Sequence, residues 1–331
     1  MISPQPVTDL LWAHWKTKIM LSAVELGVCT ELAQGPLPAA ELCARTKLHR
    51  RPAADFLDAL VALGLLERTG DAYANAPEAQ EYLDAGKPAT YLGDSFLSRG
   101  TGLADDLVSV LRTGQATQAR RDGRDFYSGT YATPDSVRAF QRDMTALSIG
   151  SARALAERFP WERYRTLVDV GCAEGALPGW LLRSHPHLTA VGFDLPVARA
   201  GFEEYTARLG VADRVEFRPG DFFQDPLPPA DVVVFGHVLH NWGEEEKLRL
   251  LAKAYEALPP GGAVVVYETL IDDDRRSNAV GLILSLIMHA EVPGGFDYTG
   301  AQCSAWLRRT GFEDTYVEHL DGPESMVVGI K

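Results

Sequence analysis

A short stretch in the middle of the chain has the residue types and spacing of a ligand-binding loop. Gly171 and Gly175 follow the β-branched run Thr166–Val170 and precede the apolar segment Ala176–Ser184. A glycine directly after a buried strand lets the backbone turn tightly and approach a ligand closely. The three-glycine dinucleotide fingerprint is not present, so a pyrophosphate is not indicated.

Two acidic residues further along the chain extend this candidate site. Asp194 ends the next predicted strand, where its carboxylate can accept hydrogen bonds from both hydroxyls of a ribose. Asp221 follows a third strand and can accept from an adenine amino group, while Phe222 packs on the ring face. The alternative interpretation is a glycine-containing turn followed by an aspartate that caps a helix. The order of the three elements favours a nucleoside-like ligand.

The elements that carry these residues alternate between strands and helices after residue 165. This alternation predicts an α/β fold with a mostly parallel sheet that is covered on both faces. The last two strands, near residues 315–319 and 326–330, are joined by a short turn and are expected to be antiparallel to each other. The earlier strands are expected at 166–170, 189–193, 215–218, 231–235 and 263–268, and the helices at 176–184, 197–209 and 244–257.

Residues 1–100 have a different, mostly helical pattern. A helix ends at Gly27, shorter helices cover residues 37–45 and 51–63, and a hairpin turns at Thr69-Gly-Asp71. This order is that of a winged-helix-like unit, which would bind DNA or pack against another copy of the chain. Residues 101–331 are then expected to form the catalytic domain, with residues 101–160 as a helical connector that contributes to the substrate pocket.

The charge balance limits the partners of the chain. Its 331 residues include 45 acidic and 32 basic ones, which gives a formal net charge of −13. Such a surface repels phosphate backbones and anionic lipid heads, so we expect neither nucleic acid nor membrane as a partner. No signal peptide or membrane-spanning stretch is recognisable, and the four cysteines lack disulfide or metal spacing. A cytoplasmic location is therefore expected.

With the glycine loop and the two aspartates in this order, the chain resembles the plant-type small-molecule O-methyltransferases and their actinobacterial relatives. Further markers are Val238-Leu-His-Asn-Trp242 after the fourth predicted strand, Gly261-Gly262 before the fifth, and Pro293-Gly-Gly295 followed by Thr299. The resemblance covers the whole chain. It implies S-adenosylmethionine as the methyl donor, a class I methyltransferase domain with a Rossmann-like sheet, and a homodimer formed through the N-terminal winged-helix unit.

The resemblance implies that six residues bind the cofactor. The first two border its methionine end, the third holds the ribose, the next two hold the adenine, and the last lies near the reacting methyl group. In this order they are Gly171, Gly175, Asp194, Asp221, Phe222 and Met144.

On the acceptor side, the resemblance implies that His240 is the general base. Neutral imidazole, with an ordinary pKa near 6.5, is available at pH 7 to take the proton of a phenol. Glu268 and Asp297 match two acidic residues that flank and orient this histidine. A carboxylate on the other ring nitrogen would fix the tautomer, and we expect Glu268 to have this role.

Several positions depart from the family pattern. Cys172 and Ala173 replace glycines of the cofactor loop, which narrows the space for its backbone. Around the histidine, Asn241 replaces an aspartate and Gly236 replaces a lysine. The segment Phe296-Asp-Tyr-Thr299 stands where Lys-Glu-Arg-Thr is common.

A metal is not expected, but one alternative includes it. His240, Asn241 and His289 would then converge on an ion, because imidazole suits zinc and iron. His289 lies on an apolar helical run, which is more typical of a core or pocket-lining residue. The acceptor pocket is mostly apolar and suits a flat or hydrophobic acceptor. Its expected residues are Asn241, Met288, Val292 and Phe126.

Three hypotheses for the function follow. The first is an O-methyltransferase acting on a phenolic or polyketide-like hydroxyl in secondary metabolism, with His240 as the base. The second is a metal-assisted C-methyltransferase acting on the carbon next to a 2-oxo acid carbonyl, with His240 and His289 at an ion that stabilises the enolate. The third is a winged-helix binding protein that holds the cofactor only as a ligand or not at all.

Overall fold

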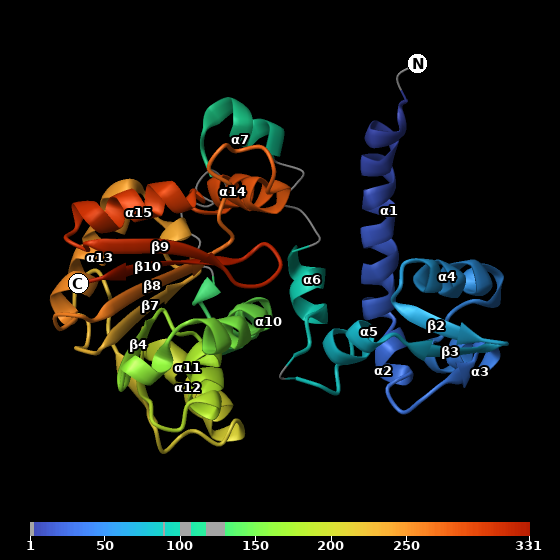
Figure 1. Cartoon of the computed structure of the whole chain (residues 1–331). Coiled ribbons are helices and arrows are strands. Elements are labelled where there is room, and N and C mark those ends of the chain that lie inside the picture. The colour runs from blue at the N-terminus through green and yellow to red at the C-terminus, as the bar shows by residue number, and fades with distance from the viewer. Residues whose placement is uncertain (1–2, 89, 100–106, 117–129) are drawn as a thin grey trace. The chain divides into compact units, whose positions relative to one another are not determined.

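The computed structural model describes residues 3–88, 90–99, 107–116 and 130–331 (Figure 1). The chain divides into two compact units, Met1–Thr101 and Gly102–Lys331. This division lies next to the boundary expected between residues 100 and 101.

The first unit consists of helices around a small antiparallel sheet. Its strands lie in the order β1–β3–β2, and β2 and β3 form the expected hairpin. The prediction of one helix over residues 37–45 is wrong at its start, because the extended backbone of Pro38 pairs with Ala72 and the helix begins at Ala39. The elements are α1 (Gln5–Glu25), α2 (Val28–Glu31), β1 (Leu37–Pro38), α3 (Ala39–Thr46), α4 (Arg50–Ala62), β2 (Leu66–Thr69), β3 (Ala72–Asn75), α5 (Pro77–Tyr82) and α6 (Gly93–Arg99).

Helix α1 exposes apolar side chains within this unit. Val7, Leu10, Trp12 and Trp15 are each more than half exposed. The two tryptophans and Ile19 border a groove whose opposite side is formed by α4. A large exposed apolar surface of this kind indicates a site that another protein surface covers.

The second unit is built on a seven-stranded sheet with the strand order β6–β5–β4–β7–β8–β10–β9. The first five strands are parallel, whereas β10 is antiparallel to both of its neighbours. This confirms the expected mostly parallel sheet with an antiparallel C-terminal strand. The strands are β4 (Thr166–Val170), β5 (Thr189–Asp194), β6 (Val215–Pro219), β7 (Val232–Gly236), β8 (Ala263–Glu268), β9 (Asp314–His319) and β10 (Ser325–Ile330).

Helices cover both faces of this sheet (Figure 1). Val168 and Val233 belong to a core cluster with α13 and α15, whereas Leu167 and Val232 belong to one with α10 and α11. Successive strand residues point to opposite faces, so strands buried on both sides are continuously apolar. The helices are α7 (Leu107–Thr113), α10 (Pro134–Arg158), α11 (Ala176–Ser184), α12 (Arg199–Arg208), α13 (Glu244–Ala257), α14 (Ala279–Glu291) and α15 (Gly300–Arg309), with short 3-10 turns η2 (Trp161–Arg163), η3 (Pro196–Ala198) and η4 (Leu239–Asn241).

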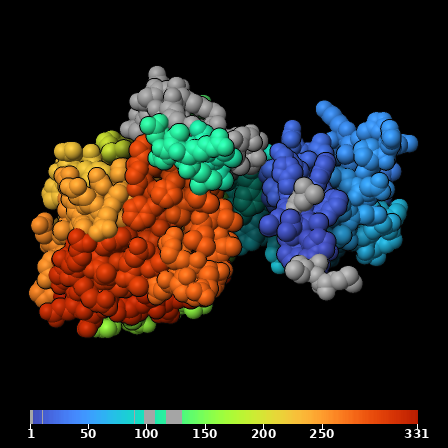
Figure 2. All heavy atoms as spheres, turned by 90° about the horizontal axis from the view of Figure 1, so that it is seen from above, coloured from blue at the N-terminus to red at the C-terminus, as the bar shows by residue number. Residues whose placement is uncertain are grey.

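Helix α7 packs against α14 at the surface of this unit, and Figure 2 shows the two in contact, turquoise against orange. Val108 and Leu111 of α7 and Val280 and Ile283 of α14 remain more than half exposed. Both helices therefore present apolar side chains. Among the described residues, no helix has the length and apolar character needed to cross a membrane.

The order of the strands reverses between β4 and β7. Strands β5 and β6 lie on one side of this point and β8 lies on the other. Ligands of open α/β sheets bind outside the carboxyl ends of the strands at such a switch point. The loop after β4 carries the two glycines of the candidate cofactor site, and the turn after β7 carries His240.

The packing beneath the cofactor loop gives a test of the fold. A Cβ atom at Gly192 in β5 would lie 2.3 Å from a ring carbon of Phe202 and 2.8 Å from Cys172 Sγ. We expect Gly192→Ala to lower the free energy of unfolding by about 1–3 kcal/mol, because the ring must move within a packed core. Chemical denaturation measures this loss. In a double-mutant cycle, Phe202→Leu should lower the stability less in the Gly192→Ala variant than in the unmodified protein. Losses that simply add would contradict this packing.

Candidate active site

The cofactor loop after β4 contains three residues with a left-handed backbone. The φ angle is +76° at Gly171, +49° at Ala173 and +78° at Gly175. Glycine adopts such angles without steric cost, whereas alanine is strained there. A Cβ at Gly171 would lie 2.8 Å from Val238 Cγ2, so the loop passes close to the segment after β7. Less space was expected for the loop backbone because glycines are missing. In the structure this effect is backbone strain at Ala173.

Hydrogen bonds hold this strained residue from two sides. The N–H of Ala173 donates to Asp194 Oδ2 at 2.9 Å, and its carbonyl accepts from Gln141 Nε2 at 3.0 Å. The next residue, Glu174, is buried and accepts from the Thr145 hydroxyl at 2.9 Å. Sequence reasoning missed Gln141, Thr145 and Glu174. Gln141 and Thr145 are four residues apart, so they lie on the same face of α10. This spacing is the signal that could have indicated them.

Asp194 combines burial with unused acceptor capacity. Its carboxylate accepts the N–H of Ala173 and, at 2.7 Å, that of Leu195. Burial raises the pKa of Asp194 to about 6, although the two backbone hydrogen bonds oppose the rise. An ionised carboxylate has about four acceptor positions, so two remain for the hydroxyls of a ribose.

The turn after β6 holds the expected adenine-binding residues. Asp221 Oδ1 accepts the N–H of Phe223 at 2.8 Å. The Phe222 ring lies edge-on to Phe223 and to Trp242, with centroids 4.9 and 6.0 Å apart. Because Trp242 closely follows His240 in the chain, this aromatic cluster joins the turn after β6 to the turn after β7.

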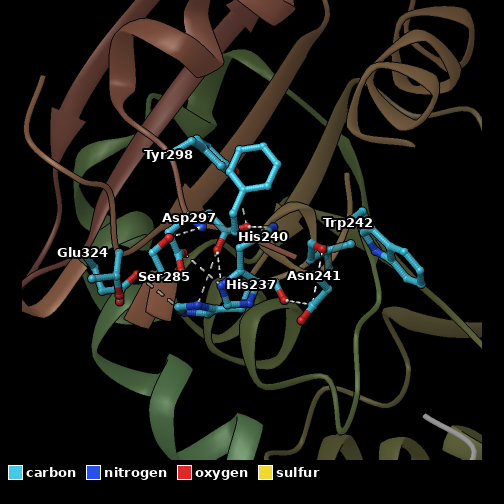
Figure 3. A network of polar contacts seen from close by, with 12 residues as sticks. His237, His240, Asn241, Trp242, Ser285, Asp297, Tyr298 and Glu324 are labelled. Carbon is cyan, nitrogen blue, oxygen red and sulfur yellow. Dashed lines mark hydrogen bonds and ion pairs between the residues drawn. The ribbon is translucent and has the colours of Figure 1, made fainter. Parts of the chain in front are cut away.

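Three buried side chains meet beside the end of β7, and Figure 3 shows two of them, His240 and Asp297. His240 belongs to η4 after β7, Glu268 is the last residue of β8, and Asp297 lies between α14 and α15. Their exposed fractions are 7%, 1% and 3%. The hydroxyl of Ser285 on α14 accepts the N–H of Asp297 at 3.2 Å, so the helix is attached to the same network.

Asp297 makes the shortest contact with the imidazole. His240 Nδ1 lies 3.1 Å from Asp297 Oδ1 and 3.4 Å from Glu268 Oε2. Glu268 Oε1 instead accepts the backbone N–H of His240 at 3.3 Å. The hydrogen-bond partner of Nδ1 is therefore Asp297 and not Glu268 as expected, while Glu268 also fixes the backbone of the turn. With Nδ1–H donating to a carboxylate, Nε2 is the nitrogen that can exchange a proton with a ligand.

The carboxylates make this histidine more basic than an ordinary one. Burial lowers the pKa of His240, but Glu268, Asp297 and Glu324 outweigh burial and raise the pKa from 6.5 to about 9. The carboxylates therefore favour the imidazolium over the neutral imidazole that was expected at pH 7. Because the folded pKa exceeds the unfolded one, the pairing stabilises the fold fully below about pH 6.5 and loses this effect as the pH rises through about 9.

His237 extends the network towards Glu324 (Figure 3). The φ angle of His237 is +53°, an uncommon conformation for a residue other than glycine. Its Nε2 lies 3.5 Å from Glu324 Oε2 and its Nδ1 lies 3.8 Å from Glu268 Oε2. Asn241 Nδ2 donates to the His237 carbonyl at 3.0 Å, so the amide of Asn241 holds the turn together.

The structure groups possible metal ligands differently from the sequence-based alternative. Within the described part of the chain, His237, His240 and Glu268 form the one group of three histidine, cysteine or carboxylate side chains with ligand atoms within 4.8 Å of one another. His289 is exposed on α14, whereas His240 is buried, and His289 does not belong to this group.

The expected acceptor residues that the structure describes lie on η4 and at the end of α14. Asn241 belongs to η4, and Met288 and Val292 are buried at the end of α14. Met144, which was expected at the cofactor, is half-buried on α10 next to Thr145. Phe126 lies outside the described residues. Sequence reasoning missed His237 and Glu324, since a histidine in a turn and a glutamate between two strands carry no signal of a shared network.

Comparisons with known proteins match both units. Residues 105–313 match the O-methyltransferase domain, and residues 8–85 match the O-methyltransferase dimerisation domain. The chain is 43% identical over 99% of its length to the tetracenomycin polyketide synthesis 8-O-methyl transferase TcmO of Streptomyces glaucescens, and the match covers 97% of that protein. It is 36% identical over 98% of its length to the N,N-dimethyltransferase OxyT of Streptomyces rimosus, with 95% of that protein covered.

A solved structure supports the same match. Human N-acetylserotonin methyltransferase in complex with S-adenosylmethionine superposes with a TM-score of 0.88 at 25% sequence identity. The superposition covers 99% of this chain and 97% of that chain.

The charge of His240 can be measured directly. We expect its imidazole to titrate near pH 9 in an NMR experiment, with the signal assigned by its loss in His240→Gln. Asp297→Asn should lower this pKa by about one unit or more, because an amide no longer stabilises the imidazolium. Titration near pH 6.5 in the unmodified protein, or an unchanged value in Asp297→Asn, would contradict the pairing described above.

Proposed function

The chain belongs to the O-methyltransferase family, and we propose that it methylates a hydroxyl of a small phenolic or polyketide-like acceptor in secondary metabolism, with His240 as the base. It is a methyltransferase, and its methyl donor is S-adenosylmethionine. The observation that carries the proposal is the buried contact of His240 with Asp297 and Glu268 beside the switch point of the sheet.

The residues after β4, β5 and β6 fit this donor. Gly171 leaves space where a Cβ would touch Val238, and the buried Asp194 has acceptor positions left for ribose hydroxyls. Phe222 offers a ring face to an adenine and Asp221 a carboxylate to its amino group. These residues would therefore hold the nucleoside part of the donor.

When bound, S-adenosylmethionine would supply a methyl carbon attached to a sulfonium sulfur, and an attack by the acceptor oxygen in line with the carbon–sulfur bond would release the sulfur as a thioether. His240 Nε2 binds the acceptor hydroxyl and takes its proton. Asp297 holds the ring through Nδ1, and Glu268 holds the backbone of the turn, so the imidazole is oriented before the acceptor arrives. After transfer the proton remains on Nε2, where the two carboxylates stabilise the imidazolium.

The raised basicity of His240 suits a phenolic acceptor. A phenol has a pKa near 10, and the pKa of His240 is about 9, so the proton moves between partners of similar affinity at little cost. A neutral imidazole beside a phenol and an imidazolium beside a phenolate differ only in which partner holds the shared proton. From either pair the acceptor oxygen can attack the methyl carbon. An aliphatic alcohol is far less acidic and would not share its proton in this way.

The proposal needs no metal. The Nδ1 atoms of His237 and His240 both face Glu268, and His240 Nδ1 also contacts Asp297, so these atoms have carboxylate partners. The C-methylation hypothesis relied on His289, which is exposed on α14.

We further propose that the chain forms a homodimer through its first unit. Residues 8–85 match a dimerisation domain, and α1 exposes Val7, Leu10, Trp12 and Trp15. Covering such side chains removes apolar area from water and stabilises association.

Transfer assays test the base. We expect labelled S-adenosylmethionine to methylate phenols, with kcat/KM rising about tenfold per pH unit up to about pH 9, because Nε2 must be free of its proton. His240→Gln should lower kcat by about 10²–10⁴-fold, and the exposed His319→Gln should not. Full activity in His240→Gln would remove the assignment.

The same assay with different acceptors separates the hypotheses. We expect transfer to phenols to survive a chelator. Transfer only to 2-oxo acids, abolished by the chelator, would replace the proposal by metal-assisted C-methylation. Transfer only to amines would contradict the hydroxyl assignment, and no detectable binding of the donor by calorimetry would contradict the enzymatic function as a whole.

The homodimer can be tested by light scattering. We expect the double variant Trp12→Glu/Trp15→Glu to be a monomer at concentrations where the unmodified chain is a dimer, because buried unpaired carboxylates cost several kcal/mol. Glu67→Lys, on the exposed strand β2, is the matched charge control and should remain dimeric. A double variant that is still dimeric would place the interface elsewhere.

A further inference from the structure

A lysine is completely buried behind the His240 turn. Lys247 belongs to the first turns of α13, and its exposed fraction is 0%. A lysine is almost never fully buried unless its ammonium group is paired. None of the roles described above involves this residue.

The ammonium group of Lys247 has a partner for each of its three N–H donors. Nζ donates to the Trp242 carbonyl at 2.6 Å and to the Phe296 carbonyl at 3.1 Å. It also lies 3.3 Å from the centroid of the Phe296 ring, which is a cation–π contact. Two carbonyls and one aromatic face therefore satisfy the group.

The two carbonyls belong to the two segments that build the site. Trp242 directly follows η4, which contains His240, and Phe296 directly precedes Asp297. The N–H of Phe296 also donates to the His240 carbonyl at 2.8 Å. Lys247 thus ties together the two chain segments whose side chains make the contact between His240 Nδ1 and Asp297 Oδ1. Figure 3 shows His240, Trp242 and Asp297 of these segments.

The charge of Lys247 also balances the site. Burial lowers the pKa of Lys247 to about 8, while Glu268, Asp297, Cys303 and Glu244 hold it up. The ammonium therefore lies in the field of the same two carboxylates that raise the pKa of His240.

We propose that Lys247 is a positioning residue for the methyl transfer, and that it fixes the distance between His240 and Asp297 by clamping the carbonyls of Trp242 and Phe296. The inference rests on the proposed function of His240 as the base. Misplacement of a reacting group by about 1 Å can cost about 10²-fold in rate. Lys247 touches neither substrate nor cofactor in this account and acts through the two segments that it joins.

Lys247→Met tests the clamp, because methionine keeps the length and apolar stem of lysine but has neither charge nor donors. We expect kcat to fall by about 10- to 100-fold while the KM for S-adenosylmethionine changes less than about twofold. The rising limb of the pH profile and the NMR titration of His240 should both move down, because a looser contact between Nδ1 and Asp297 stabilises the imidazolium less. A loss of folded protein alone would lower kcat without moving either titration.

Arg309→Met is the matched control. Arg309 also contacts α13, through an exposed ion pair with Glu244 at 2.6 Å, but it lies at the end of α15 and does not face the network. Exposed pairs contribute little, so the rate and the pH profile should stay as they are in the unmodified protein. A Lys247→Met enzyme with unchanged kcat and unchanged His240 titration would overturn the proposal.

A milder variant covers the case in which Lys247→Met does not fold. Lys247→Gln keeps a shorter, uncharged donor for the two carbonyls, so we expect a smaller shift of the His240 titration in the same direction. No shift in this variant would then overturn the proposal. The histidine titration needs no methyl acceptor, so a protein without transferase activity would contradict the proposed function and still leave the clamp testable.

Discussion

The candidate site depends on one interaction, a buried imidazole held between carboxylates from two different parts of the chain. His240 stands in the turn after β7, Glu268 ends β8, and Asp297 belongs to the segment between α14 and α15. Burial by itself would make such a histidine less basic, and the carboxylates reverse this effect. The neighbouring positions of β7 and β8 in the sheet, the attachment of Asp297 to Ser285 and the clamp at Lys247 all bring these groups to the same place.

The candidate cofactor loop follows β4, the strand next to β7. β4 pairs with β7, so the cofactor loop and the His240 turn leave the sheet side by side. The loop contains an alanine in a backbone conformation that suits glycine, and it keeps this shape because Asp194 and Gln141 hold Ala173 from two sides. Strain of this kind persists where the surroundings determine the conformation, and it is common at ligand sites. The long helix α10 therefore supports the candidate cofactor loop through Gln141 and Thr145, which the sequence did not single out.

The parts of the site that follow strand ends could be predicted from the sequence. Glycines, aspartates and a histidine directly after apolar runs must lie at one edge of a parallel sheet, and the structure has the strands where the runs predict them. Contacts that depend on tertiary packing could not be predicted. Lys247 looks like a solvated lysine on a charged helix, and the choice of Asp297 over Glu268 for Nδ1 depends on how a loop folds back. The basicity of His240 was missed because it depends on how closely Glu268 and Asp297 approach the ring inside the core, which the sequence does not show.

A crystal structure of the protein with a non-reactive analogue of the methyl donor and a phenolic acceptor tests the central claim most directly. The account predicts the acceptor oxygen within hydrogen-bond distance of His240 Nε2, about 2.6–3.2 Å, with Nδ1 still on Asp297. The same oxygen should lie about 3–3.5 Å from the position of the methyl carbon, in line with its bond to sulfur. An acceptor hydroxyl that is bound by another side chain, with His240 turned away or coordinated to a metal ion, would contradict it.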